Sequence, residues 1–215
     1  MQYMIHASPK RMWYVEKCLI PSMTDQGILD KDIVVWNDAR GKGNLVSCME
    51  SFQDCGKRDG GTWHLQDDVI ICHDFAKRTA DFDNGVVCGF CCEHFEATTE
   101  NIGEVEVRLM WYSFQCIRIP NQLAGECADW FYNDASKRDK YRFKVLSNKY
   151  DDTFWMDFMA EKHRDMKVTN LVPNLVDHID FVIGGSLVNK LRGNKERRAF
   201  YFEDASLVEE LKNKL

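Results

Sequence analysis

The stretch Trp63–Phe75 reads WHLQDDVIICHDF and sets two adjacent acids, Asp67 and Asp68, inside an apolar run. The residues from Thr62 to Leu65 have the pattern of a buried strand, which ends at the acids. A charge at the end of a buried strand is costly unless another group pairs with it. Taken alone, such a pair indicates a solvated turn. At the edge of a sheet, however, it can bind a divalent cation, which in turn binds phosphates.

Two further strands are predicted before this stretch. Met4–His6 belongs to a short opening strand, and Ile33–Trp36 is a compact apolar run typical of a strand buried on both faces. Helical spacing follows each of them, over 11–20 and 45–52. This alternation predicts a parallel sheet with right-handed crossovers. Because ligands of such sheets bind at the carboxyl ends of the strands, three polar clusters should converge there: His6-Ala7-Ser8, Asn37-Asp38 and Gln66-Asp67-Asp68.

The second half of the chain is less regular. It predicts strands over 86–90, 105–110, 114–119 and 167–172, helices over 120–132 and 152–162, and a polar loop over 133–149. A last helix follows, with Ser206 and Glu209 as its capping box. We therefore expect an α/β fold, a single Rossmann-like domain over residues 1–215 whose mostly parallel central sheet is flanked by helices.

Composition narrows the class of protein. The chain has 215 residues, 45% of them hydrophobic and 29% charged, which is ordinary for one soluble globular domain. No apolar run approaches the roughly 20 residues that span a bilayer, and no signal peptide is evident. Nine cysteines, an odd number, indicate reduced thiols in the cytoplasm. A net charge of −6 gives no global basic footprint for nucleic acid.

Several acids and one histidine carry two interpretations each. Asp38 could bind a ribose or a base, or it could start an Asx turn in the loop that follows, whose glycine spacing is not that of a P-loop. Asp151 and Asp152 begin a predicted helix, where they could cap it or supply a general base. His178 follows a strand and is either structural or a ligand of a divalent metal.

Two other segments bear on metal and nucleic-acid binding. Cys88 to His94 reads CGFCCEH, which suggests zinc, but no second CxxC is present, so free thiols are favoured. Lys190 to Tyr201 reads KLRGNKERRAFY, which is a solvated segment or a flap that binds phosphates or nucleic acid.

Taken in order, these motifs resemble a nucleotide-sugar glycosyltransferase of the GT-A fold, of a compact type whose viral or cellular origin stays open. The similar segments cover most of the chain: HASPKR (6–11), VVWNDARGKGN (34–44), WHLQDDVIICHDF (63–75), CIRIPNQLAGECADWF (116–131), DDTFWMDFM (151–159) and VPNLVDHIDFVIGGSL (172–187). Two departures stand out. Gln66 occupies the place of the usual first acid of the metal-binding signature, and the chain is short, so that any acceptor subdomain must be minimal.

The resemblance implies a reaction and a set of residues. A hexosyl- or pentosyltransferase would bind the donor, favoured as a UDP-sugar, in residues 1–95, and the acceptor in residues 96–215. Mn²⁺ or Mg²⁺ held by Asp68 and His178 would bridge the donor diphosphate. Asp152, or in second place Asp151, would act as the base of an inverting transfer. The implied donor-binding residues are His6, Ala7, Ser8, Arg11, Asp38, Gly43, Asn44, Gln66 and Asp67, and the implied acceptor- or phosphate-binding residues are Lys190, Arg192 and Lys195.

The acceptor and two alternatives stay open. A protein, a small molecule or hydroxymethylpyrimidines in DNA could accept the sugar, and the basic stretch near the C-terminus favours DNA, without a membrane partner. The expected compartment is the cytoplasm, or the host cytoplasm for a viral chain. The alternatives are a non-catalytic nucleotide-binding α/β module, which Gln66 favours, and a zinc-binding DNA-associated protein.

Overall fold

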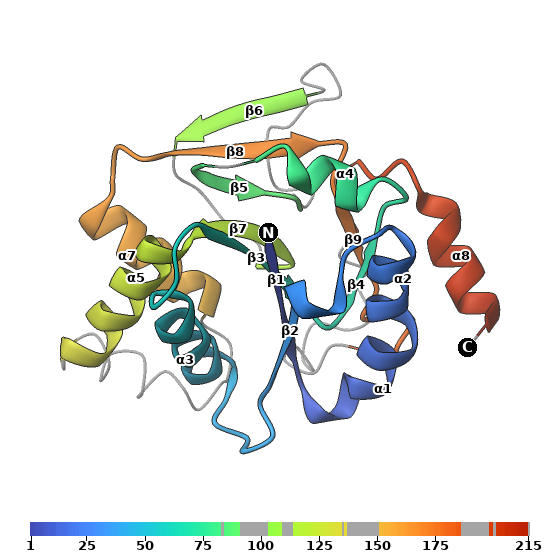
Figure 1. The fold of residues 1–215 in the computed structure, drawn as a ribbon, viewed down its shortest axis with the longest axis horizontal. Coiled ribbons are helices and arrows are strands. Elements are labelled where there is room, and N and C mark those ends of the chain that lie inside the picture. Colours follow the sequence, from blue (N-terminus) through green and yellow to red (C-terminus); the bar gives the residue numbers. More distant parts are fainter. Residues whose placement is uncertain are drawn as a thin grey trace.

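A seven-stranded sheet forms the centre of the computed structural model, in the order β2-β1-β3-β7-β5-β8-β6 (Figure 1). The structure describes residues 1–82, 84–90, 103–108 (backbone only), 114–134, 136, 151–185, 198–199 and 201–214. Five strands run in one direction, whereas β6 and β7 run against them. The strands are β1 (Gln2–Ala7), β2 (Ile33–Asn37), β3 (Gly61–Gln66), β5 (Val86–Cys88), β6 (Gly103–Arg108), β7 (Cys116–Pro120) and β8 (Lys167–Val172).

Helices cover both faces of this sheet, as Figure 1 shows. One face carries α3 (Asn44–Cys55), α5 (Asn121–Asn133) and α7 (Asp151–Lys162). The other carries α1 (Met12–Tyr14), α2 (Ile20–Asp25), α4 (Phe75–Ala80) and α8 (Ala205–Lys214), with a π-helical turn over Val15–Leu19 between α1 and α2. The expected α/β class, with a mostly parallel sheet flanked by helices, is confirmed.

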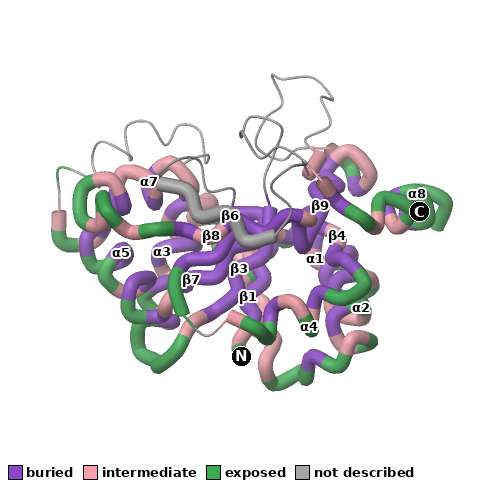
Figure 2. The backbone as a smooth tube through the Cα atoms, turned by 90° about the horizontal axis from the view of Figure 1, so that it is seen from above, coloured by how far each residue is buried: buried purple, intermediate pink, exposed green. Residues whose placement is uncertain are grey.

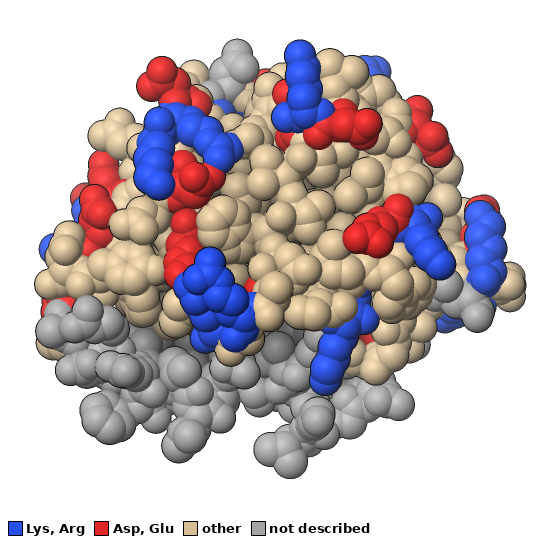
Figure 3. All heavy atoms as spheres, turned by 60° about the horizontal axis from the view of Figure 1, so that its bottom comes forward, with Lys and Arg blue, Asp and Glu red and all other residues tan. Residues whose placement is uncertain are grey.

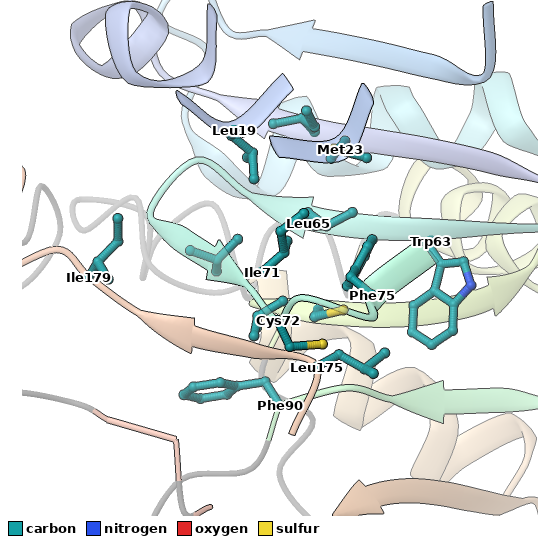
Figure 4. Packing of buried hydrophobic residues seen from close by; sticks show 14 of the residues in the cluster. Leu19, Met23, Trp63, Leu65, Ile71, Cys72, Phe75, Phe90, Leu175 and Ile179 are labelled. Carbon is teal, nitrogen blue, oxygen red and sulfur yellow. The ribbon is translucent and has the colours of Figure 1, made fainter. Parts of the chain in front are cut away.

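The core lies in two layers because successive strand residues point to opposite faces. On β1, Ile5 belongs to the layer under α1 and α2, whereas Met4 belongs to the layer under α3 and α5. Figure 2 shows that the central strands are buried along most of their length. Figure 4 shows Trp63 and Leu65 of β3 packed with Phe75 of α4 in the first of these layers.

A second, two-stranded sheet was not expected from the sequence. The strands β4 (Val69–Ile71) and β9 (Val176–His178) pair antiparallel, with Val69 opposite His178. The apolar run after the acid pair is therefore a strand of its own, separated from β3 by a turn at Asp67 and Asp68. This small sheet carries His178 to the end of β3.

Two expectations about local structure are wrong. The strand Ile33–Trp36 is not buried on both faces, because β2 is the edge of the sheet and these four residues are only half-buried. Ser206 does not cap the last helix, because α8 begins at Ala205 and includes Ser206. Asp204 precedes that helix, and its carboxylate accepts hydrogen bonds from the backbone and the ring of His73 at 2.8 Å each, which ties the start of the helix to the segment after β4.

The remaining elements lie close to their predicted places. The strands predicted over 62–65, 86–90, 105–110, 114–119 and 167–172 correspond to β3, β5, β6, β7 and β8, and the helices predicted over 45–52, 120–132 and 152–162 to α3, α5 and α7. Residues 109 and 110, and nearly all of the predicted loop at 133–149, lie outside the described residues. In the part of the chain that the structure describes, no helix has the length and apolar character needed to cross a membrane.

Candidate functional site

The strand order creates a switch point at the end of β1. The chain leaves β1 toward β2 on one side and later returns to β3 on the other. Ala7 pairs with Asn37, and His6 pairs with Gln66, so the carboxyl ends of the three strands lie at one edge. The predicted convergence of the three polar clusters is confirmed. Open α/β sheets bind ligands in the crevice at such a point.

The acid pair is buried and bonded, so it is not a solvated turn. Asp67 and Asp68 are each 6% exposed. The backbone N–H of Ser8 donates to Asp67 Oδ2 at 2.6 Å. Arg11 Nη1 donates to Asp67 Oδ1 at 3.0 Å and to Asp68 Oδ2 at 2.5 Å. The loop after β1 and the turn after β3 are therefore joined through one buried guanidinium.

His178 completes this cluster, as the sequence predicted for a partner of Asp68. It is fully buried in β9, and its Nε2 lies 3.2 Å from Asp68 Oδ2. Its Nδ1 lies 3.3 Å from Asp180 Oδ1, on the turn that follows β9. The pairing of β4 with β9 produces this contact, because it sets His178 opposite the residue that follows Asp68.

The charges of the cluster shift the pKa values of its members. Burial opposes ionisation of Asp68, but the charge and hydrogen bond of His178, followed by those of Arg11, lower the pKa of its carboxyl. Burial favours the neutral imidazole of His178, yet the carboxylates of Asp68 and Asp180 outweigh it and raise the pKa to about 9. For Asp67, burial and the charge of Asp68 raise the pKa against the opposing effect of Arg11. At neutral pH the cluster therefore holds two cations, Arg11 and His178.

Several buried polar atoms around the switch point have no hydrogen-bond partner among the described residues. Buried polar groups are almost always hydrogen-bonded, so several unpaired ones close together indicate a candidate ligand-binding site. Gln115 was not singled out in the sequence. It lies just before β7, and its amide donates to Gln66 Oε1 at 3.4 Å. The unpartnered atoms are Ser8 Oγ, Arg11 Nε, Asp68 Oδ1 and Gln115 Oε1.

The residues of this site fit a divalent ion that arrives together with phosphate oxygens. Among the described residues, no group of three or more His, Cys, Asp or Glu side chains is placed to hold a metal. Asp68 Oδ1, however, is buried and unpartnered. Mg²⁺ is commonly bound by one or two carboxylates and completed by substrate phosphates. Asp68 can therefore be the protein's carboxylate ligand, and His178 would have to lose its proton to be a second ligand.

Asp38 closes the loop that follows β2, which is the second of its two interpretations, the Asx turn. Its carboxylate accepts hydrogen bonds from the backbone N–H groups of Lys42 and Gly43, both at 2.9 Å. Gly43 adopts a φ of 91°, a conformation that favours glycine. The loop leads directly into Asn44, the first residue of α3. Asp38 thus fixes the loop between the carboxyl end of β2 and the start of α3.

His6 is half-buried, and its ring contacts the buried His64 of β3. Its Nε2 lies 2.9 Å from Nδ1 of His64, and the two rings are stacked. Burial lowers the pKa of His6 to about 4, and burial and His6 lower that of His64 well below its ordinary value. The pair is therefore neutral at physiological pH. His64 also contacts Phe52 of α3 edge-on.

The second acid pair begins α7, as predicted, but its two members differ. Asp151 is 6% exposed, and burial followed by the charge of Asp152 raises its pKa to about 7. A hydrogen bond with Asn44 opposes this shift of the pKa. The same hydrogen bond shows that the start of α7 lies beside the start of α3. Asp152 is half-buried and accepts a hydrogen bond from the backbone N–H of Thr153 at 2.6 Å.

Some predicted residues lie outside the described part of the chain. These are the basic residues Lys190, Arg192 and Lys195 and the run from Cys91 to His94. Cys88 of the CxxC motif is buried on β5, and the seven described cysteines are free thiols.

A hollow of about 270 Å³ lies at the opposite edge of the sheet, away from the acid pair. Arg118 of β7 lies in it, is buried and donates to the carbonyl of Gly85 at 2.8 Å. A Cβ on Gly61 would lie 2.7 Å from its Cζ atom, so glycine makes room for this arginine. The hollow is thus built around a structural side chain.

Comparison with known proteins gives a structural likeness but no family. No family model matches the chain, and no curated protein matches it. The crystal structure of A197 from STIV is similar over 83% of this chain and 86% of that chain, at 13% sequence identity and a TM-score of 0.47. A likeness of this strength supports no statement about function.

Proposed function

We propose that the protein is a glycosyltransferase that moves a sugar from a nucleotide-sugar donor, favoured as a UDP-sugar, to an acceptor hydroxyl. The observation that carries this proposal is the group of buried polar atoms at the switch point, on Ser8, Arg11, Asp68 and Gln115, that have no partner among the described residues. They combine donors for phosphate oxygens with a carboxylate that suits a divalent ion. The resemblance of the ordered motifs to GT-A enzymes supports the same class.

Each residue of the site has a separate task in this proposal. The hydroxyl of Ser8 and the guanidinium of Arg11 bind the diphosphate of the donor, and the Asp38 loop shapes the crevice beside the nucleoside. Asp68 holds Mn²⁺ or Mg²⁺, with His178 beside it. When bound, the ion offsets the charge that develops on the leaving diphosphate.

Proton transfer is assigned to the second acid pair. Asp152 accepts the proton of the acceptor hydroxyl while that oxygen forms its bond to the anomeric carbon. The bond from this carbon to the diphosphate breaks, and the nucleoside diphosphate leaves with the electron pair, so the configuration inverts. Asp152 suits this role better than Asp151, because Asp152 is half-buried, whereas Asp151 is buried and hydrogen-bonded to Asn44.

A panel of nucleotide sugars, each added with and without Mn²⁺, tests the donor site by thermal unfolding. A ligand that binds only the native state raises stability by about 2.7 kcal/mol at 100 times its Kd. We expect one sugar nucleotide to stabilise the wild type only with Mn²⁺, and Asp68→Asn to lose this shift. No shift with any member of the panel would contradict the proposal.

Transfer separates an enzyme from a non-catalytic nucleotide-binding module. Asp152→Asn should lower the rate of transfer by about 10²–10⁴-fold, the usual contribution of a general base, and leave donor binding intact. Donor binding with neither transfer nor donor hydrolysis in the wild type would favour the binding module instead.

DNA is kept as the proposed acceptor on the basis of the basic segment near the C-terminus. Figure 3 shows Lys and Arg side chains interspersed with Asp and Glu over the described part of the side that faces down in Figure 1. Transfer to hydroxymethylated duplex DNA should therefore depend on the segment around Lys190, Arg192 and Lys195, and fall steeply with salt. The free thiols of the described cysteines are in keeping with the cytoplasm as the proposed compartment.

A further inference from the structure

Arg11 is a buried cation at the place where the proposed function puts a metal ion. Its side chain is 5% exposed. Nη1 donates to Asp67 Oδ1 at 3.0 Å and to Asp68 Oδ2 at 2.5 Å, and Nη2 donates to the carbonyl of Gly185 at 2.8 Å. One guanidinium therefore ties the loop after β1 to the acid pair and to the turn after β9.

We propose that Arg11 sets the affinity of this site for a divalent cation, by holding Asp68 in the ligand-free protein and moving to the donor diphosphate when the ion binds. This inference rests on the proposed function, because it takes Asp68 as the carboxylate that receives the ion. It adds a coupling between the ion and the diphosphate that the proposed function does not require.

The contacts of Asp68 imply that Arg11 opposes the binding of a divalent ion to this carboxylate. Asp68 Oδ2 already lies within contact distance of both Arg11 Nη1 and His178 Nε2, which leaves Oδ1 for an ion. A divalent ion at Oδ1 would lie beside the positive guanidinium, in a buried place where repulsion between like charges is poorly screened. The protein alone therefore binds the ion weakly while Arg11 keeps its position.

A diphosphate relieves this repulsion. Guanidinium groups bind phosphate oxygens through two parallel hydrogen bonds, and Arg11 Nε has no partner among the described residues. Once phosphate oxygens accept from Arg11, Asp68 is free to bind the ion, which the same phosphates also bind. Ion and diphosphate therefore strengthen each other's binding, and by linkage the coupling is reciprocal.

Binding of Mn²⁺ alone tests the inference without any enzymatic assay. It is measured from the electron paramagnetic resonance signal of the free ion. Two neutral variants, Arg11→Gln and Arg11→Met, should bind Mn²⁺ about tenfold or more tightly than the wild type, a typical size for such coupling. Arg11→Lys keeps the charge and should stay within about threefold of the wild type. Asp68→Asn, alone or with Arg11→Gln, should remove the binding.

The outcomes distinguish this inference from the proposed function. If Asp68→Asn removes Mn²⁺ binding but the neutral Arg11 variants bind Mn²⁺ no more tightly than the wild type, the inference is wrong and the proposed function stands. If neither the wild type nor any variant with Asp68 intact binds Mn²⁺, even with inorganic pyrophosphate present and its own chelation subtracted, both are wrong.

A test on the wild type keeps the inference falsifiable if the neutral variants do not fold. Phenylglyoxal modifies accessible arginines, and mass spectrometry locates the modified residue. At saturating Mn²⁺, displaced Arg11 should be modified faster than in the protein without metal, whereas Arg118, buried at the opposite edge of the sheet, serves as the control. An unchanged rate of modification at Arg11 would overturn the inference.

Discussion

The two Asp–Asp pairs of this protein have the same sequence and opposite surroundings. Asp67 and Asp68 are buried against the guanidinium of Arg11, and Asp68 also against the imidazole of His178. Asp151 is equally buried, but among the described residues the charge that shifts its pKa is that of Asp152, and it shares a hydrogen bond with Asn44. The pKa of Asp68 is consequently lowered, whereas that of Asp151 is raised to about 7.

This difference shows that burial alone does not decide the chemistry of a carboxylate, because its charged partners can outweigh it. Cations next to Asp68 keep it ionised, so that it can exchange one cation for another. Desolvation and the charge of Asp152 keep a proton on Asp151 at moderately acidic pH. Enzymes that use two carboxylates for two tasks separate their pKa values in the same way. In the proposed function the first pair binds an ion and the second pair handles a proton.

Asp68→Asn should give the largest effect on stability. The substitution leaves Arg11 and His178 buried without the carboxylate that both contact. Breaking a buried ion pair by removing one partner costs about 3–5 kcal/mol. Urea unfolding at pH 7 measures this loss. Asp67→Asn is the matched control and should cost less, because Asp67 contacts one cation only. Equal losses in the two variants would remove the distinction between the two acids.

The sheet around the first pair was largely predictable, because apolar runs and helical spacing are local patterns. The strands β1, β2 and β3 follow one another along the chain, and their parallel order followed from the helices between them. The edge position of β2 was not predictable, since burial depends on which strands lie beside it. The small sheet was missed because β4 pairs with β9, more than 100 residues away in the sequence.

The site was predicted only in part for a similar reason. The proximity of Asp68 and His178 was implied by the resemblance and is present at 3.2 Å. The position of Arg11 between the two acids was not predicted, because an arginine after a strand has the same local pattern whether it is solvated or buried. Its burial depends on contacts with Asp67, Asp68 and Gly185, which lie 56, 57 and 174 positions further along the chain. Gln115 was missed because its partner Gln66 lies on a different strand.

Asp151→Asn should abolish a pH dependence of the free energy of unfolding, and this effect should be of intermediate size. Asp151 keeps its proton up to about pH 7 in the folded protein, but only to about pH 4 in the unfolded chain. The stabilisation from this proton is complete below pH 4 and is lost as the pH rises through 7. Asparagine resembles the protonated acid, so the variant should match the wild type near pH 4 and exceed its free energy of unfolding by about 1–3 kcal/mol at pH 8. A wild type that is more stable than the variant at pH 8 would show that a cation pairs with Asp151.

Asp152→Asn should have the smallest effect on stability and still test the coupling within the second pair. Asp152 is half-buried in the first turn of α7, where an acid contributes about 0.3–1 kcal/mol through the helix dipole. Its charge is also the second cause, after burial, of the raised pKa of Asp151. The variant should therefore lose a fraction of a kcal/mol near pH 5, where Asp151 keeps its proton, and should regain part of this at pH 8, where the ionised Asp151 no longer faces the charge of Asp152. Its fall in stability with rising pH should end at a lower pH than in the wild type. Unfolding curves at half-unit pH steps from 4 to 8 measure both quantities, and Asp157→Asn, an acid further along the same helix, is the control for a general change in charge. If the pH at which the fall ends did not move, Asp151 would be held protonated by burial alone, and the two acids of the second pair would act independently.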